Sequence, residues 1–149
     1  MSRKKKNEGP ILVVAAVIRQ GEHFLICKRP IHKSHGGLWE FPGGKMNPDE
    51  SIEAALRREI IEELGVDVIS TGAVLFVGQE PESEFEIHFV EVIISGEPRP
   101  LEHERFEWTL PNQFKIYSMA PMDLKFAEQL SNEYNRRKET LYSSQDSNP

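Results

Sequence analysis

The chain has 149 residues, of which 38% are hydrophobic and 28% charged, which predicts one soluble domain with its own core. Its formal net charge of −6 disfavours an extended nucleic-acid groove, which requires a basic surface. The single cysteine, Cys27, excludes an intrachain disulfide, and its apolar surroundings are typical of a small buried side chain. Because no apolar run approaches the length of a membrane span and no signal-peptide pattern is visible, we expect a cytoplasmic protein without membrane contact.

The first predicted elements are a tail and a hairpin. Residues 1–9 are basic and polar, and we expect them to form a disordered tail. The nearly continuous apolar run 11–19 predicts a buried strand, and residues 23–28 predict a second strand after a short turn. Three further segments follow: a polar loop at 29–37, a short extended piece at 38–41 and a glycine turn at 42–44.

The clearest predicted element is a helix over residues 48–64. Asn47 suits the N-cap, Pro48 suits the first helical position, and Glu50 stands three residues after the cap, as in a capping box. Gly65 is a natural C-terminal stop. The side of this helix that we expect to be buried carries an apolar stripe of Leu56, Ile60 and Leu64.

The rest of the chain is predicted to add strands and one more helix. The three expected strands cover 66–77, 85–95 and 105–110, the last of them short. Residues 122–138 predict an amphipathic helix, because apolar side chains recur there at steps of four. Strands and helices that mix without strict alternation indicate a domain of the α+β class or a layered α/β/α domain.

These elements predict a single domain over residues 10–139. We expect it to lie between the basic tail at 1–9 and a second disordered tail at 140–149, which is rich in Ser, Gln and Asn. The sequence contains neither an internal repeat nor a stretch typical of a domain linker.

Three glutamates of the first predicted helix occupy one arc of its surface. Glu59, Glu62 and Glu63 are spaced i, i+3 and i+4, so they are neighbours and repel one another. A divalent cation relieves this repulsion, and Mg²⁺ is commonly held by carboxylates together with substrate phosphates. The alternative is a solvated acidic face in which Arg58 pairs with Glu62, and the clustering of acids alone favours this alternative.

The glycine turn before the helix favours the metal site. Gly43 and Gly44 permit unusual backbone angles and allow a metal or ligand to approach the main chain closely. A backbone carbonyl in this turn can serve as a further hard oxygen ligand. The alternative is an ordinary connection between a strand and a helix.

Together these residues resemble the signature of the Nudix hydrolases, G-x5-E-x7-R-E-U-x-E-E-x-G-U, in which U is a bulky aliphatic residue. All nine defined positions agree: Gly44, Glu50, Arg58, Glu59, Ile60, Glu62, Glu63, Gly65 and Val66. The resemblance is to MutT-like members and extends over most of the chain through the run 38–45, Trp108 and the segment 120–123. It implies an α/β/α sandwich with a mixed central sheet.

The resemblance also implies a metal-dependent hydrolase that uses Mg²⁺, for which Mn²⁺ can substitute. The implied metal ligands are the Gly44 carbonyl, Glu59, Glu62, Glu63 and a loop glutamate, Glu102, six residues before the tryptophan. Glu104 and Glu107 are nearby alternatives for that loop ligand. Glu50 and Arg58 would orient the helix and its ligands.

The implied reaction is attack of a metal-activated water on a phosphorus of a polyphosphate. A carboxylate takes the proton as general base, and Glu59 is the first choice and Glu102 the second. In MutT-like enzymes a nucleoside triphosphate yields a monophosphate and pyrophosphate. The partner of this chain is therefore expected to be a small nucleotide.

Three residues are candidates for binding the nucleotide: Arg29, Phe41 and Asp123. Phe41 suits the core as well as stacking on a base, and Asp123 alternatively caps the last helix. The best-known 8-oxoguanine-specific MutT has asparagine at the position of Asp123, and an aspartate makes the same pair only when protonated. Oxidised dGTP (8-oxo-dGTP) is the leading substrate, whereas an ionised Asp123 would favour an amino-bearing base, as in CTP or dCTP.

Other functions compete with this one. An RNA 5′-pyrophosphohydrolase is disfavoured by the acidic charge balance. A catalytically silent module that only binds a nucleotide is disfavoured by the intact signature, and a purely structural acidic helix leaves the nine matching positions unexplained. The chain is expected to be a monomer or a homodimer.

Overall fold

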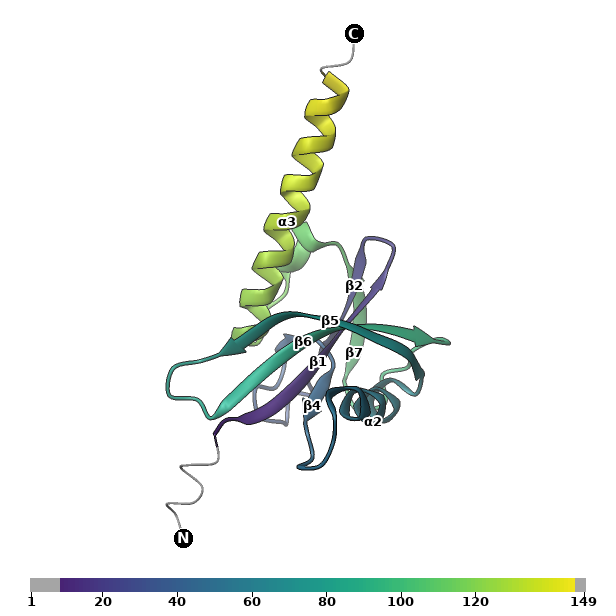
Figure 1. Ribbon diagram of the computed structural model, residues 1–149, viewed down its shortest axis with the longest axis vertical. Coiled ribbons are helices and arrows are strands. Elements are labelled where there is room, and N and C mark those ends of the chain that lie inside the picture. Colours follow the sequence, from purple (N-terminus) through teal and green to yellow (C-terminus); the bar gives the residue numbers. More distant parts are fainter. Residues whose placement is uncertain (1–8, 147–149) are drawn as a thin grey trace.

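The computed structural model describes residues 9–146, with side chains described up to Tyr142. The elements in chain order are β1 (Ile11–Gln20), β2 (His23–Lys28), β3 (Trp39–Glu40), β4 (Gly43–Lys45), α2 (Ile52–Leu64), β5 (Asp67–Gln79), β6 (Phe85–Ser95), β7 (Arg105–Thr109), the 3₁₀ helix η1 (Pro111–Ile116) and α3 (Pro121–Asp146). Figure 1 shows α2 on one side of the strands and α3 on the other.

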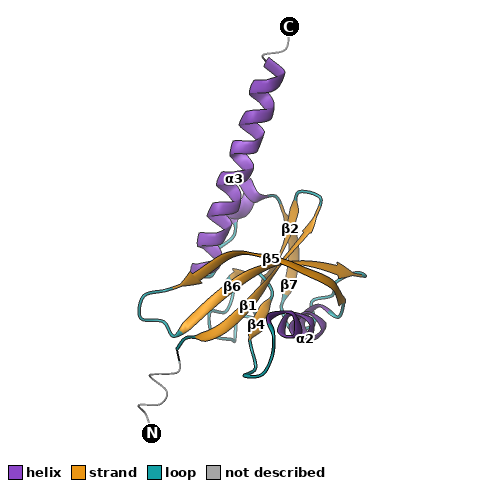
Figure 2. Cartoon of the chain, viewed as in Figure 1, coloured by secondary structure: helices purple, strands orange, loops and turns teal. Residues whose placement is uncertain are grey.

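The strands form one mixed sheet. Its main path runs β3-β2-β1-β6-β5, while β4 pairs with β1 and β7 pairs with β2. The β1–β6 pair is parallel and the other pairs are antiparallel. Figure 2 shows the strands between the two helices, which confirms the predicted α/β/α sandwich with a mixed central sheet.

The continuous apolar run of β1 is explained by the burial of both its faces. Val14, Ala16 and Ile18 belong to the core under α2, whereas Ala15 and Val17 belong to the core under α3. A strand covered on both sides has no polar face, so the alternation of polar and apolar residues disappears. Cys27 is fully buried as predicted, and burial raises the pKa of its thiol.

Helix α2 is shorter at its start than predicted. It begins at Ile52, and the hydroxyl of Ser51 accepts the capping hydrogen bond from the Ala54 amide at 3.1 Å. The prediction that Asn47 caps the helix is wrong, although the Glu50 carboxylate does accept a hydrogen bond from the Asn47 amide, at 2.9 Å. The predicted stop at Gly65 is confirmed, because this residue has φ 67° and its amide closes the last turn.

Two other segments differ from the predictions. Gly43–Lys45 is a strand, β4, rather than only a turn, because its backbone pairs with β1. Helix α3 runs to Asp146, so residues 140–146 are helical rather than part of a disordered tail. Its later half projects beyond the sheet (Figure 1). The predicted tail residues 1–8 and 147–149 lie outside the described part of the chain.

One side of α2 is buried along its whole length, whereas residues 135–142 of α3 are all exposed. Leu56, Ile60 and Leu64 of α2 are fully buried, which confirms the predicted apolar stripe.

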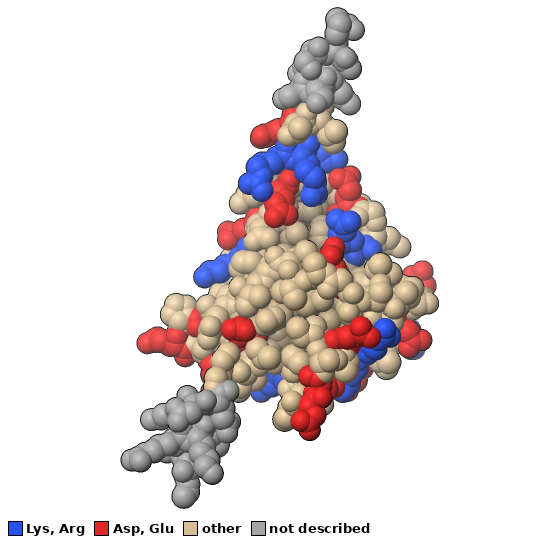
Figure 3. Space-filling model, in the orientation of Figure 1, with Lys and Arg blue, Asp and Glu red and all other residues tan. Residues whose placement is uncertain are grey.

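Between Gly9 and Asp146, no helix is both long enough and apolar enough to cross a membrane. On the face in Figure 3, acidic and basic side chains are interspersed, with one group of basic side chains on the projecting part of α3.

Candidate active site

The acidic arc of α2 is divided between the domain and solvent. Glu59 and Glu63 lie one turn apart and face inward, with side chains 13% and 4% exposed. Glu62 points outward, with its side chain 47% exposed, and its carboxylate lies 3.8 Å from Arg58. The helix therefore brings two of its three predicted metal ligands into the interior, and the third stands at the rim.

The glycine turn lies directly against these glutamates. A Cβ at Gly44 would overlap the Glu59 carboxylate, and a Cβ at Gly43 would overlap the carbonyl of Val14 on β1. The Gly43 amide donates a hydrogen bond to Oε1 of Glu63 at 3.3 Å. Gly43 is thus required for the close approach of β4 to β1, whereas a side chain at Gly44 would displace the Glu59 carboxylate.

A small cavity of about 80 Å³ brings together three of the five predicted metal ligands, Glu59, Glu63 and Glu102, whereas Gly44 and Glu62 are not among the residues that line it. It is lined by Arg29, Pro30, Lys33, Glu40, Gly43, Glu59, Glu63, Glu102 and His103. Glu102 reaches the cavity from the loop before β7, so the fold brings this residue to the glutamates of α2 as predicted. Glu104, one of the two alternatives, pairs instead with Lys28 at 3.2 Å.

The cavity fits a hard divalent cation by the chemistry of its oxygen atoms. Oε2 of Glu63 is buried and has no hydrogen-bond partner within the described residues. Burial, and next the charge of Glu59, raise the pKa of Glu63 to about 9. Within residues 9–146, no three side chains of His, Cys, Asp or Glu converge closely enough to hold a metal ion by themselves. A cation would draw Glu59, Glu63 and Glu102 together and offset the repulsion that raises this pKa.

Arg58 connects the signature residues. Its guanidinium contacts both carboxylate oxygens of Glu50 at 2.7 Å, Oε1 of Glu59 at 2.9 Å and the Lys45 carbonyl at 3.0 Å. The hydrogen bonds from Arg58 lower the pKa of Glu50 to about 2. The contact with Glu62 is longer than these, so the main partners of Arg58 are Glu50 and Glu59. Arg58 fixes the side chain of Glu59 beside β4.

The substitution Arg58→Lys is expected to lower kcat about tenfold or more, in the range typical of residues that orient metal ligands. A lysine has no planar fork and cannot bind Glu50, Glu59 and the Lys45 carbonyl at once. Steady-state kinetics would measure the change. Arg57→Lys is the matched control, because Arg57 pairs with Glu53 on the exposed side of α2. Equal activity of the two variants would contradict a positioning role for Arg58.

A larger pocket of about 520 Å³ adjoins the small cavity. Arg29, Glu40 and Gly43 line both spaces, so a ligand can extend from one into the other. The pocket also receives the other two predicted nucleotide-binding residues, Phe41 and Asp123. The pocket and the cavity therefore have the arrangement required by a nucleotide whose phosphates reach the acidic residues.

Arg29 stands at the boundary between the pocket and the cavity. Its guanidinium pairs with Glu40 at 3.2 Å and donates to the Ser34 carbonyl at 2.8 Å. These contacts hold the side chain where phosphates would pass.

Phe41 contributes mainly to the core. Its ring is 3% exposed and contacts Phe89, Phe114 and Phe126. It lines one wall of the pocket, but its backbone amide makes the contact that matters for Asp123.

Asp123 is a buried carboxyl group in the first turn of α3, two residues after the start of the helix, so it does not cap it. Its Oδ2 accepts a hydrogen bond from the Phe41 amide at 2.9 Å. Burial raises the pKa of Asp123 to about 8, because the hydrogen bond from Phe41 offsets only part of the loss of hydration. Burial therefore favours the neutral acid at this position.

The prediction from sequence missed His103 and Glu40. Nε2 of His103 lies 3.0 Å from Oε2 of Glu40, and Nδ1 lies 3.6 Å from Oε1 of Glu63. His103 is adjacent to the predicted ligand Glu102, and this position in the chain was the only available signal. Glu40 lies in the run 38–45 that carries the resemblance, but nothing in that run singles it out as a site residue.

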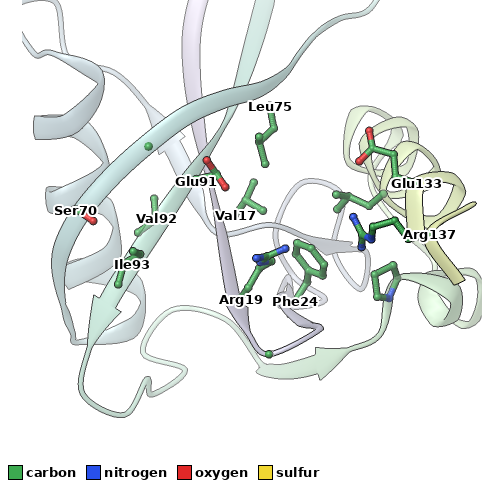
Figure 4. A pocket seen from close by; sticks show the side chains of 14 residues that line it. Val17, Arg19, Phe24, Ser70, Leu75, Glu91, Val92, Ile93, Glu133 and Arg137 are labelled. Carbon is green, nitrogen blue, oxygen red and sulfur yellow. The ribbon is translucent and has the colours of Figure 1, made fainter. Parts of the chain in front are cut away.

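A second groove, of about 670 Å³, lies elsewhere on the α3 side of the sheet. Figure 4 shows Arg19 and Arg137 near Phe24 in this groove, and Glu91 and Glu133 also line the groove. Both arginines are exposed and none of the signature residues reaches this groove. It is therefore separate from the candidate active site.

Known proteins resemble the chain over most of its length. The NUDIX domain family matches residues 9–130. The CTP pyrophosphohydrolase of Escherichia coli (strain K12) is 36% identical over 121 residues, covering 79% of this chain and 89% of that protein. The 8-oxo-dGTP diphosphatase of Proteus vulgaris is 38% identical over 68 residues, covering 46% of this chain and 57% of that protein.

Solved structures agree with this. The E. coli ORF135 protein in solution has a TM-score of 0.69 at 36% identity, covering 80% of this chain and 87% of its own. The MutT NUDIX hydrolase from Burkholderia pseudomallei has a TM-score of 0.72 at 27% identity, covering 83% of this chain and 99% of its own. With the family matched over residues 9–130 and a MutT-like fold around an intact signature, the chain belongs to the Nudix hydrolases, among their MutT-like members.

Proposed function

We infer that the chain is a Mg²⁺-dependent pyrophosphohydrolase that cleaves a nucleoside triphosphate to a monophosphate and pyrophosphate. The observation that carries this function is the junction of two spaces. An acidic cavity lined by Glu59, Glu63 and Glu102 opens beside a pocket large enough for a nucleoside, and Arg29 lines both. A triphosphate spans such a junction with its phosphates beside the carboxylates.

The metal site in this proposal consists of the Gly44 carbonyl, Glu59, Glu62, Glu63 and Glu102. Bound Mg²⁺ would lower the pKa of water and neutralise the phosphate charge, and Mn²⁺ can take its place. Glu62 requires a side-chain rotation to join, since it lies at the rim. Glu50 and Arg58 hold Glu59 in place.

The chain's own carboxylates handle the proton. Water attacks a phosphorus, the P–O bond to the departing group breaks, and the proton of the water passes to a carboxylate oxygen. Glu59 is our first choice for this general base, because it lines the cavity and is held by Arg58 beside β4. Glu102 is the second choice. Arg29 faces the phosphates and can exchange its contact with Glu40 for one of their oxygens.

A neutral Asp123 supports 8-oxo-dGTP as the leading substrate. A protonated carboxyl group offers one donor and one acceptor side by side. 8-Oxoguanine presents an acceptor, O6, next to a donor, N7–H, and matches this pair. Guanine presents two acceptors at the same edge and does not match. A buried Asp123 that keeps its proton would thus distinguish the oxidised base from the normal one.

CTP or dCTP is the second candidate, for a specific reason. Cytosine also presents an acceptor next to a donor, N3 beside its amino group, so a neutral Asp123 can pair with it as well. A relative that matches 79% of this chain is named a CTP pyrophosphohydrolase. An RNA 5′ end stays a weaker candidate, because the net charge is −6.

A nucleotide panel tests the function. Pyrophosphate release with Mg²⁺ would be measured for 8-oxo-dGTP, dGTP, CTP, dCTP, ATP and a triphosphorylated short RNA. We expect the kcat/KM for 8-oxo-dGTP to exceed that for dGTP at least tenfold, with Glu59→Gln as the inactive control. A preference for cytosine nucleotides would instead identify CTP or dCTP as the substrate. A folded protein that binds metal but turns over none of these compounds would leave a silent nucleotide-binding module.

A further inference from the structure

A chain of polar contacts links the substrate-facing wall to the metal-facing wall. Arg29 pairs with Glu40 at 3.2 Å, and Oε2 of Glu40 lies 3.0 Å from Nε2 of His103. On the other side of the imidazole ring, Nδ1 lies 3.6 Å from Oε1 of Glu63. All four side chains line the small cavity. His103 therefore stands between two carboxylates that belong to different elements of the fold.

The ring of His103 is fixed from one side. Its side chain is only 6% exposed, so it has little room to rotate into solvent. The contact with Oε2 of Glu40 at 3.0 Å occupies Nε2 of the ring and leaves Nδ1 for the opposite side. Nδ1 then faces Glu63, and it is one of only two buried side-chain atoms within the described residues that have no hydrogen-bond partner.

The other such atom is Oε2 of Glu63. The two oxygens of this carboxylate have different surroundings: Oε1 accepts from the Gly43 amide at 3.3 Å and faces Nδ1, whereas Oε2 has no protein partner. Oε1 and Nδ1 lie 3.6 Å apart, so a small rotation of either side chain brings them within hydrogen-bond distance. The carboxylate is then anchored through Oε1 and presents Oε2 to the cavity.

We propose that His103 is a positioning residue that holds Oε1 of Glu63 so that Oε2 is directed at the metal, while Glu40 fixes the ring. This arrangement follows the general rule that a residue hydrogen-bonded to a metal ligand sets the orientation of that ligand. Because Glu40 also pairs with Arg29, the same chain of contacts connects the ligand to the residue that faces the phosphates. The inference rests on the metal site of the proposed function.

Amide side chains can separate the two contacts of the ring. A glutamine amide reaches the position of Nε2 and keeps the contact with Glu40. An asparagine amide reaches the position of Nδ1 and keeps the contact with Glu63. Leucine keeps neither. The variants His103→Gln, His103→Asn and His103→Leu therefore differ in the one contact that matters for the metal ligand.

The measurement is Mn²⁺ binding to the nucleotide-free full-length protein by calorimetry. We expect a dissociation constant at least tenfold higher in His103→Gln and His103→Leu, and within threefold of the wild type in His103→Asn. Saturating Mn²⁺ should restore most of kcat in His103→Gln. The control is His88→Gln, because His88 also pairs with a glutamate, Glu86 at 2.7 Å, but lies on β6 outside the cavity, with its side chain 20% exposed.

Several outcomes would overturn the inference. Unchanged Mn²⁺ affinity in all three variants, with only the melting temperature lowered, would mean that His103 is a packing residue. Equal losses of Mn²⁺ affinity in His103→Asn and His103→Leu would mean that the contact between Nδ1 and Glu63 does not support metal binding. Mn²⁺ is measured without substrate, so the inference stands if the expected pattern is found even when no nucleotide is hydrolysed. If the wild type binds no Mn²⁺, both the inference and the proposed metal site fail.

Discussion

Replacing Glu59 by glutamine is expected to reduce kcat by about 10²–10⁴-fold, the range that a general base contributes. The amide keeps the size of the side chain and an oxygen for Arg58, which now contacts Oε1 at 2.9 Å. It cannot accept the proton of the attacking water, and it removes one negative charge from the cavity. Because the shape is preserved, we expect the melting temperature to change little.

A control on the same helix separates this effect from a general loss of acidity. Glu53 lies on α2 with its side chain 55% exposed and pairs only with groups outside the cavity, so Glu53→Gln should keep kcat within twofold. Metal titration of both variants would show how much of the loss at Glu59 comes from weaker Mg²⁺ binding. Near-normal activity of Glu59→Gln, together with loss of activity in Glu102→Gln, would identify Glu102 as the general base instead of Glu59.

The substitution Asp123→Asn is expected to change the pH dependence of turnover. In the wild type the donor at this position disappears as Asp123 ionises, with a pKa of about 8. An asparagine keeps a donor and an acceptor at every pH, including an oxygen for the Phe41 amide. The kcat/KM for 8-oxo-dGTP of the variant, relative to the wild type, should therefore rise steadily above about pH 8. A constant ratio from pH 6 to pH 10 would contradict recognition by the neutral acid.

The same substitution is expected to alter stability with a defined sign. The folded protein keeps the proton of Asp123 up to about pH 8, whereas the unfolded chain releases it near the ordinary aspartate pKa of 3.8. Between these values the folded state binds more protons, so the free energy of unfolding of the wild type decreases as the pH rises. Asp123→Asn does not titrate, so its stability relative to the wild type should increase over this range, by about 6 kcal/mol at most.

Denaturant unfolding at pH 4.5 and pH 8 tests this sign. The gain in stability of Asp123→Asn over the wild type should be small at pH 4.5 and largest at pH 8. Asp49→Asn is a suitable control, because Asp49 lies in the polar loop before α2. A gain of equal size at both pH values would mean that the amide improves packing and that the proton of Asp123 has no part in it.

The helix of the signature shows which features are encoded locally. The spacing of Glu59 and Glu63, the apolar stripe and the stop at Gly65 all follow from residues within one helix, and the structure has them as predicted. The start of the helix was predicted wrongly, because Asn47 and Ser51 are both good caps in isolation. Pairing of β4 with β1 holds the preceding residues in a strand and a loop, so the helix starts only at Ile52.

The sequence by itself determined the family, the sandwich of mixed strands and helices and the cluster of glutamates on one arc of α2, because these depend on periodicity and on a motif of short span. Only the tertiary structure decided that Glu104 pairs with Lys28 while Glu102 lines the cavity, that His103 stands between Glu40 and Glu63, and that the carboxyl group of Asp123 is buried with a raised pKa. The physical reason is that these properties depend on burial and on distances between segments far apart in the chain. Desolvation and approach across strands and loops have no periodic pattern in the sequence, so they appear only when the chain is folded.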